Sequence, residues 1–214
     1  MVTESVVAVV DDDGSERTAV RRVLSRAGAR IEEFATGQSF LDCFHPGRAV
    51  CVLLELHLPD ISGLLVQKRL STYDLAPPVV VTTRKGDVGS AVEAMKFGAI
   101  DYLMKPIPEH ILVDCVRRAI AQNARDREDF SRRREIAARF ALLTIRERDV
   151  MHMVVRGFAN KLIATHMHLS TKTIEAHRAR VMRKMQADSL PELVRCAGMI
   201  DDGVPTVVAP APDA

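Results

Sequence analysis

The stretch Val50-Cys51-Val52-Leu53-Leu54-Glu55-Leu56-His57-Leu58-Pro59 decides how the rest of the chain is interpreted. Its first five residues are apolar, which is typical of a strand buried on both faces of a parallel sheet. Glu55 follows at the carboxyl end of this strand. In doubly wound α/β domains, ligands bind beyond the carboxyl ends of the strands. Glu55 therefore either belongs to a binding site or only solvates the end of a strand.

Length and composition indicate a two-domain globular protein. The chain has 214 residues, and its hydrophobic share of 47% is sufficient for packed cores. It contains no apolar run of about eighteen residues and no charged leader before an apolar segment, so we expect a cytoplasmic protein without membrane insertion or export. The four cysteines have no paired spacing and are expected to be reduced core residues, neither a zinc site nor disulfides: Cys43, Cys51, Cys115 and Cys196.

Charge is distributed unevenly along the chain. Residues 1–124 carry 14 Lys and Arg against 16 Asp and Glu, whereas the remaining residues carry 16 against 12. The net charges of the two parts are therefore −2 and +4. A basic C-terminal half favours nucleic acid as its partner.

Apolar runs and helical patterns alternate through the first half of the chain. We expect strands over residues 5–10, 31–34, 50–54, 79–83 and 100–104, and helices over residues 16–27, 37–44, 64–70, 88–97 and 108–123. Ser15 is expected to cap the first helix. The last helix is expected to turn these residues toward the core: Ile111, Val113, Val116 and Ile120. The alternation predicts a (βα)5 doubly wound parallel sheet with right-handed crossovers.

Polar side chains follow four of the predicted strands. Asp11 and Asp12 end the first strand, Glu55 the third, Thr83 the fourth and Lys105 the fifth. Because parallel strands end at the same edge of a sheet, these side chains are expected to meet. Carboxylates can hold Mg²⁺, whereas a hydroxyl and an ammonium can bind the oxygens of a phosphoryl group or of a carboxylate that imitates it.

Several motifs occur in the same half: Val10-Asp11-Asp12-Asp13, Leu58-Pro59-x-x-Ser62-Gly63-Leu64, Thr83-x-x-Gly86-Asp87, and Ala94-Met95-Lys96-x-Gly98-Ala99-x-Asp101-Tyr102-x-x-Lys105-Pro106. With these motifs, residues 5–123 resemble the receiver domain of two-component response regulators, in its FixJ-like branch. The resemblance implies that Asp11 and Asp12 are metal-binding acids, with Mg²⁺ on Asp12 and Glu55. It further implies that Thr83 and Tyr102 are switch residues, that Lys105 pairs with phosphate, and that the Lys105-Pro106 peptide is cis. A sensor histidine kinase would be the partner that donates the phosphate.

The chain departs from this family at the phosphoacceptor position, where Glu55 replaces an aspartate. The additional methylene moves the carboxylate by about 1.5 Å. Such a misplacement can slow a reaction that depends on positioning by about a hundredfold. We therefore expect a regulator that is independent of phosphorylation, in which Glu55 partly imitates the phosphorylated state. The alternative is an inactive receiver that serves as a dimerisation or protein-interaction module under the control of a partner.

The second half of the chain reads as a bundle of short helices. Residues 124–142 are highly charged and are expected to form a solvated linker helix, either separate from the helix over residues 108–123 or continuous with it. Thr144 and Glu147 have the spacing of a capping box at the start of the next helix. Further helices are expected over residues 160–167, 171–185 and 190–200. The 171–185 helix combines an apolar face with a mostly basic face, which is typical of a recognition helix in the major groove of DNA.

Three motifs support a second resemblance: Leu143-Thr144-x-Arg146-Glu147, Gly157-x-x-Asn160-Lys161-x-Ile163-Ala164, and Ser170-x-Lys172-Thr173-Ile174-Glu175-x-His177-Arg178. Residues 143–200 resemble the LuxR-type helix-turn-helix domain of the same regulators, which implies binding to double-stranded DNA. By this resemblance, contacts to phosphates come from Lys161, Lys172, Thr173 and Arg183. Contacts to base edges come from Glu175, Ala176 and Ala179, because a carboxylate can accept from cytosine and alanine can contact a thymine methyl.

The combined prediction is a DNA-binding transcription regulator rather than an enzyme. Its expected parts are a receiver (residues 1–123), a linker helix (124–142), a DNA-binding domain (143–200) and a disordered tail (201–214). The resemblance also implies a homodimer, formed through the face of residues 88–123. An acid-cluster phosphotransferase would need a nucleophilic aspartate at position 55. An adaptor that does not bind DNA would lack the steep salt dependence of phosphate contacts.

Overall fold

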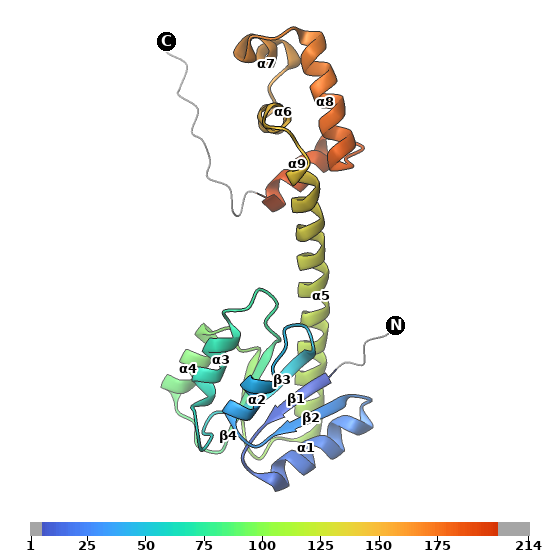
Figure 1. Cartoon of the computed structure of the whole chain (residues 1–214). Helices are drawn as coiled ribbons and strands as arrows, with labels where there is room; N and C mark the ends of the chain where they lie inside the picture. Colours follow the sequence, from blue (N-terminus) through green and yellow to red (C-terminus); the bar gives the residue numbers. More distant parts are fainter. Residues whose placement is uncertain (1–5, 201–214) are drawn as a thin grey trace. The chain divides into compact units, whose positions relative to one another are not determined.

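The structure is a computed structural model that describes residues 6–200 of the chain. It divides into two compact units, Met1–Glu128 and Asp129–Ala214 (Figure 1). The predicted disordered tail, residues 201–214, lies outside the described residues. Between residues 6 and 200, no helix combines the length and the apolar character needed to cross a membrane.

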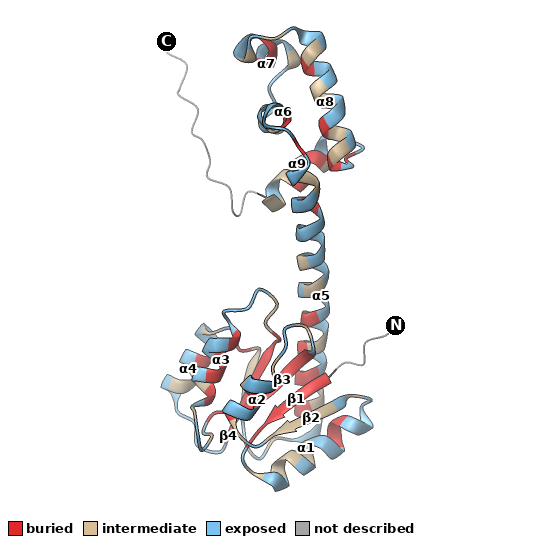
Figure 2. Cartoon of the chain, viewed as in Figure 1, coloured by how far each residue is buried: buried red, intermediate tan, exposed pale blue. Residues whose placement is uncertain are grey.

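The first unit is built on a five-stranded parallel sheet with strand order β2-β1-β3-β4-β5. The strands are β1 (Val6–Val10), β2 (Arg30–Phe34), β3 (Ala49–Glu55), β4 (Val79–Thr83) and β5 (Asp101–Met104). All residues of β1, β3 and β4 are buried, and these strands form the red centre of the unit in Figure 2. The predicted (βα)5 doubly wound sheet is confirmed.

Helices cover both faces of this sheet. They are α1 (Gly14–Arg26), α2 (Gly37–Cys43), α3 (Gly63–Leu70), α4 (Val88–Lys96) and α5 (Glu109–Ala141). Successive strand residues point to opposite faces. Val7 and Val9 therefore pack with α1 and α5, whereas Ala8 and Val10 pack with α2, α3 and α4. The two cores hold β1, β3 and β4 rigidly, so their carboxyl ends are fixed relative to one another.

Three local predictions for this unit are corrected by the structure. Asp13, not Ser15, caps α1, because its carboxylate accepts from the backbone N–H groups of Ser15 and Glu16. Ile111 is 40% exposed, whereas its neighbour Leu112 is 4% exposed and belongs to the core. The helix expected over residues 108–123 does not end at residue 123: α5 continues without a break to Ala141, the arrangement in which the linker helix extends the last receiver helix.

The second unit is a bundle of helices around one core. After the end of α5 it contains α6 (Ile145–Val155), α7 (Asn160–Met167), α8 (Thr171–Met185) and α9 (Leu190–Ile200). The caps explain these bounds: Thr144 and Glu147 form a capping box for α6, and Ser170 caps α8. The core contains Ile136 of α5 together with apolar residues of all four later helices. The core thus fixes one face of α8 and leaves the opposite face exposed.

Candidate functional site

The centre of the candidate site is an ion cluster at the carboxyl edge of the sheet. Lys105 follows β5, and its Nζ lies 2.5 Å from Oδ2 of Asp11 and 2.6 Å from Oε2 of Glu55. All three side chains are only 6–7% exposed. The acids come from the ends of β1 and β3, neighbouring central strands, so the sheet itself holds them on either side of the ammonium. The Lys105-Pro106 peptide is cis.

Burial and pairing act in opposite directions on this cluster. Burial raises the pKa of Asp11, although the hydrogen bond from Lys105 opposes that increase. Burial also disfavours the charged form of Lys105, but the hydrogen bonds to Asp11 and Glu55 outweigh it and raise the lysine pKa. The ammonium is therefore charged at neutral pH and satisfies two buried carboxylates at once.

The backbone around Glu55 leaves little room for change. The second carboxylate oxygen of Glu55, Oε1, accepts from the backbone N–H of His57 at 3.2 Å. The backbone carbonyl of Glu55 lies against Gly63, where an added Cβ would come within 2.3 Å of the oxygen. Only glycine fits at that position, which brings the start of α3 close to the end of β3. Glu55 is consequently fixed both by its side chain and by its backbone.

Thr83 is fully buried, and its hydroxyl makes no hydrogen bond with Glu55. Its hydroxyl lies 3.2 Å from the backbone N and O of Lys85 and 3.3 Å from Nδ1 of His57. The same Nδ1 is 4.0 Å from Oε1 of Glu55. His57, which is 64% exposed at its side chain, is therefore the link between the two predicted site residues.

Tyr102 is half-buried and packs against the core on the side of α2, α3 and α4. Its hydroxyl lies 3.0 Å from Oγ of Ser90, which forms a capping box with Asp87 at the start of α4. A Cβ added to Gly86 would come within 2.5 Å of the Tyr102 hydroxyl, so the loop after β4 packs closely on this ring. The position of Tyr102 is thus coupled to the loop that follows Thr83.

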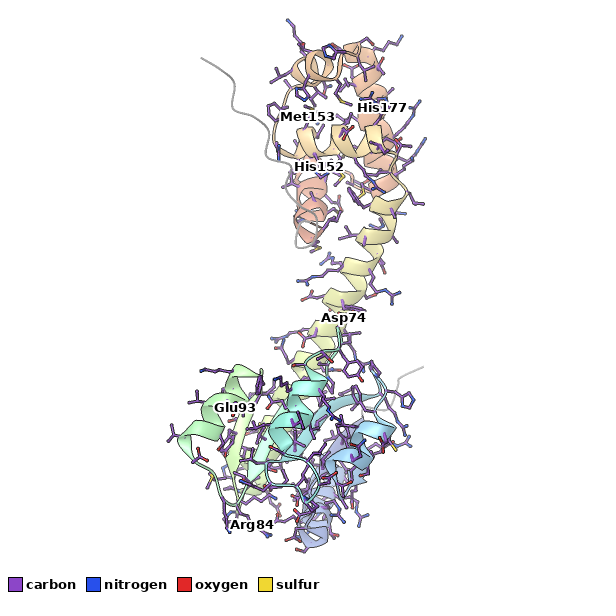
Figure 3. All side chains as sticks on the ribbon, turned by 60° about the vertical axis from the view of Figure 1, so that its left-hand side comes forward. Asp74, Arg84, Glu93, His152, Met153 and His177 are labelled. Carbon is purple, nitrogen blue, oxygen red and sulfur yellow. The ribbon has the colours of Figure 1, made fainter. Side chains whose placement is uncertain are left out.

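A second ion cluster, at the same edge, was missed by the sequence analysis. Nη2 of Arg84 lies 2.7 Å from Oδ2 of Asp13 and 2.7 Å from Oε1 of Glu16. In Figure 3, Arg84 lies at the opposite end of the unit from Asp74, which is in the connection between α3 and β4. Asp12, by contrast, is exposed and makes no hydrogen bond or ion pair with the other described residues. The sequence did contain a signal for this second cluster, because more acidic residues than lysines follow the strands that end at this edge.

The predicted Mg²⁺ site can be tested against this arrangement. Mg²⁺ requires near-octahedral oxygen ligands and gives up its water reluctantly. Carboxylates are suitable ligands, but Glu55 is paired with Lys105, and Asp12 is an exposed side chain. In the part of the chain that the structure describes, no three His, Cys, Asp or Glu side chains are placed to hold a metal ion. As arranged, a Mg²⁺ ion on Asp12 and Glu55 would have to displace Lys105 from Glu55, so the pocket fits this ion poorly.

The predicted DNA-contacting residues lie on the surface of the second unit. Those of α8 are exposed, except for Thr173, which is half-buried: Lys172, Thr173, Glu175, Ala176, Ala179 and Arg183. The Thr173 hydroxyl lies 2.8 Å from Oγ of Ser170, so it also belongs to the cap of α8. Lys161 is exposed on α7. These side chains form a mixed surface of cations, one carboxylate and two alanines along α8.

Two polar contacts that the sequence analysis did not predict hold α8 in place. Nζ of Lys184 donates to Oε2 of Glu147 at 2.6 Å, and this carboxylate also accepts from the backbone N–H of Thr144 at 2.9 Å. Arg178 donates to Oδ1 of Asn160 at 3.0 Å, which ties α8 to the start of α7. His177, labelled in Figure 3, lies on α8, and its Nδ1 is buried with no hydrogen-bond partner among the described residues.

Family models match both parts of the chain. The model described as a response regulator receiver domain matches residues 7–117. The model for bacterial regulatory proteins of the luxR family matches residues 141–197. Between them they cover the acidic pocket and the whole of α6, α7 and α8.

Individual relatives match over nearly the full length. The transcriptional regulatory protein FixJ of Bradyrhizobium diazoefficiens is 40% identical over 206 residues, which are 94% of this chain and 100% of that protein. FixJ of Rhizobium meliloti is 36% identical and covers 92% of this chain and 96% of its own. Among solved structures, the response regulator StyR has a TM-score of 0.79 and 34% identity, over 91% of this chain and 98% of its own. Full-length FixJ from B. japonicum has a TM-score of 0.54 and 38% identity, over 94% of this chain and 99% of its own.

Proposed function

The chain belongs to the response regulators that join a receiver domain to a LuxR-type DNA-binding domain, and we propose that it regulates transcription without a phosphorylation cycle. Membership makes it a two-component regulator of the FixJ type that binds DNA, with a histidine kinase as the partner implied by its receiver. The proposal concerns how the receiver is controlled. It places Glu55 in the role that a phosphorylated aspartate has in the family.

The contact between Glu55 and Lys105 carries the proposal. The lysine that matches the family's phosphate-pairing residue lies 2.6 Å from a permanent carboxylate instead. A carboxylate has about one negative charge, whereas a phosphate has roughly two and offers three acceptor oxygens. The imitation is therefore partial: Glu55 reaches the lysine, but reaches Thr83 only through His57.

The same contacts make Glu55 a poor phosphate acceptor. Oε2 accepts from Lys105 and Oε1 from the backbone N–H of His57, so both oxygens are engaged. The side chain is 7% exposed, so a phosphodonor would have to approach a buried oxygen that already accepts a hydrogen bond. Phosphoryl transfer depends mainly on positioning and electrostatics, so a displaced and occupied nucleophile is slow.

The alternative is a receiver that has lost signalling and serves as a dimerisation or protein-interaction module. The observation in its favour is the Thr83 hydroxyl, which is held by Lys85 and His57 rather than by Glu55. Under this alternative, the charge of residue 55 has no effect on DNA binding. The two functions therefore differ in a measurable way.

Two further parts of the proposal concern partners. We infer that the DNA surface is the exposed side of α8 with Lys161, and that the protein acts in the cytoplasm as a homodimer. The proposed dimer face carries exposed apolar side chains on α4, β5 and α5: Val88, Val92, Met95, Met104 and Ile111. Apolar groups gathered on one face of a soluble domain typically mark an interaction surface.

The test compares the wild-type chain with Glu55→Gln and Glu55→Asp. We expect both variants to dimerise more weakly and to bind a duplex selected by the wild-type protein about tenfold more weakly, within the usual range of coupling between two sites. Sedimentation measures the dimer, and fluorescence anisotropy measures DNA binding. Acetyl phosphate with Mg²⁺ should leave the wild-type affinity unchanged.

Glu32→Gln is the matched control, because Glu32 is also a paired carboxylate of the first unit but lies on β2. Equal DNA binding by the wild type and both Glu55 variants would refute the proposal and leave the alternative.

A further inference from the structure

The carboxyl edge of the sheet carries more negative charge than Lys105 can balance. Five carboxylates lie at the ends of β1 and β3 and in the first turn of α1: Asp11, Asp12, Asp13, Glu16 and Glu55. Lys105 pairs with Asp11 and Glu55, and Arg84 pairs with Asp13 and Glu16. Arg17 also approaches, but it donates to the backbone carbonyl of Asp11. Since neighbouring carboxylates repel one another, the two cations offset part of the repulsion within the group.

Arg84 joins two loops that are far apart in the sequence. Its contacts with Asp13 and Glu16 span 71 and 68 residues. Oδ1 of Asp13 meanwhile caps α1 by accepting from Ser15 and Glu16, so neither oxygen of Asp13 is available without loss of a contact. Hydrogen bonds from Ser15 and Arg84 hold the pKa of Asp13 well below its usual range. The contacts of Arg84 and the cap of α1 therefore both favour the ionised form of Asp13.

Arg84 lies in the loop next to the predicted switch residues Thr83 and Tyr102, so its pairing with Asp13 and Glu16 affects that loop. Arg84 directly follows Thr83, whose hydroxyl is already held by Lys85 and His57. Gly86 then packs on Tyr102. Because the side chain of Arg84 pairs with Asp13 and Glu16, it restrains the loop that follows β4. This loop contains Lys85, which holds the Thr83 hydroxyl, and Gly86, which packs on Tyr102.

We propose that Arg84 is a built-in cation that joins the β1–α1 and β4–α4 loops and lowers the affinity of the acidic pocket for divalent cations. A guanidinium is permanently charged and has planar donors that can serve two carboxylates, so this closure needs no metal ion. It also adds a positive charge to the sheet edge that carries Asp11, Asp12 and Glu55, which disfavours a dication there. The inference goes beyond the proposed function, because it concerns the entrance of the pocket and not the effect of Glu55 on DNA binding.

The first test is a Mg²⁺ titration of the full-length, ¹⁵N-labelled protein, followed through the amide shifts of residues 11–13 and 55–57. We expect Arg84→Gln to respond at about tenfold lower Mg²⁺ concentration than the wild type, as is reasonable for removing one unit charge near a dication in a partly exposed site. The control is Arg48→Gln. Arg48 is 52% exposed against 55% for Arg84, and it also pairs with a carboxylate, but it lies at the other end of the sheet. If Arg84→Gln responded to the same Mg²⁺ concentrations as the wild type, the proposal that Arg84 lowers the affinity of the pocket for divalent cations would be overturned.

The second test measures the joining of the loops without Mg²⁺. Hydrogen exchange of the amides of residues 14–16 and 84–87 should be about fivefold faster in Arg84→Gln, the upper end for an exposed ion pair. Arg48→Gln should leave these amides unchanged, and thermal unfolding checks that all variants are folded. If these amides exchanged at the wild-type rate in Arg84→Gln, the proposal that Arg84 joins the two loops would be overturned. Neither test involves DNA, so its failure is separate from a failure of the Glu55 experiment.

Discussion

Glu147 is a buried carboxylate that links the start of α6 to α8. Its side chain is 4% exposed, and Oε2 accepts from Lys184 and from the backbone N–H of Thr144. The hydrogen bond from Lys184, followed by that from Thr144, lowers the pKa of Glu147 to about 2. A proton on this carboxylate would remove the attraction to Lys184 and weaken the cap of α6. The ionised form is therefore part of the folded second unit.

This pKa predicts acid sensitivity of the second unit. Because the folded pKa lies below the ordinary value of 4.5, the contribution to stability is complete above pH 4.5 and is lost as the pH falls toward 2. Glu147→Gln should cost about 2 kcal/mol at pH 7, in the range for hydrogen bonds to charged groups. The free energy of unfolding of this variant should also fall less steeply between pH 4.5 and 2 than that of the wild type.

Urea unfolding of the full chain, followed by NMR signals of residues 145–185, measures both effects. Glu135→Gln, at a 64% exposed carboxylate of α5, is the control and should retain the wild-type pH profile. A Glu147→Gln protein with an unaltered acid profile would contradict the prediction.

Single contacts differ in how far the sequence could predict them. Asp11, Glu55 and Lys105 were expected at one edge because their strands are parallel, and a buried strand fixes where its last residue lies. The pairing of Arg84 with Asp13 was not predicted, because the path of a loop decides which of its side chains meet. The cap of α1 shows the same limit: Asp13 and Ser15 both suit an N-cap, and only the backbone distinguishes them.

At the scale of elements, α8 combines two faces with different tasks. Ile174, Val181 and Met185 are buried in the core of the second unit, which fixes the rotation of the helix about its axis. The α8 residues proposed for DNA contact lie outside this core, and all of them except Thr173 are exposed. Lys172 and Arg183 offer charges for phosphates, whereas Glu175 and the alanines offer groups that distinguish bases.

This division predicts two kinds of mutant. Lys172→Ala should weaken binding to selected and to random duplexes equally and reduce the slope of log affinity against log salt by about 1. Glu175→Ala should change the preference at one base pair, by about 1–3 kcal/mol, and leave the salt slope nearly unchanged. Anisotropy titrations at several salt concentrations measure both quantities.

Arg195→Ala, an exposed arginine on α9, should leave affinity and slope as in the wild type. If Lys172→Ala kept the full salt slope, α8 would not be the phosphate-contacting helix.

Element bounds were predictable where caps mark them. Residues 160–167 and 171–185 were expected as helices and are observed with the same bounds, because capping residues and left-handed residues stand at several of their ends. For the helix over residues 108–123, the sequence left two possibilities open: an end near residue 123, where the composition becomes charged, or continuation into the linker helix. A change in polarity does not end a helix, and residues 109–141 contain neither glycine nor proline, so the backbone continues.

At the scale of the whole molecule, the proposed function requires that a change in the receiver alters DNA binding by the second unit. Helix-turn-helix dimers bind two half-sites, and linking two DNA-binding units raises the effective concentration of the second. A charge in the acidic pocket can therefore act on DNA binding through the dimer alone. The proposed dimer face is suitable, because Val88, Val92 and Met95 follow one another at helical spacing and are 80%, 48% and 50% exposed.

A double-mutant cycle tests this connection. Val92→Asp should abolish the dimer at micromolar protein and weaken binding to a two-half-site duplex, because a buried charge in an apolar interface is costly. If Glu55 acts only through the dimer, Glu55→Gln should weaken DNA binding in the wild-type background but should have no further effect in Val92→Asp. Leu65→Asp, at a 42% exposed leucine of α3, is the control and should leave the effect of Glu55→Gln intact. Additive losses in the Glu55→Gln, Val92→Asp protein would mean that the pocket influences the DNA-binding unit by a route other than dimerisation.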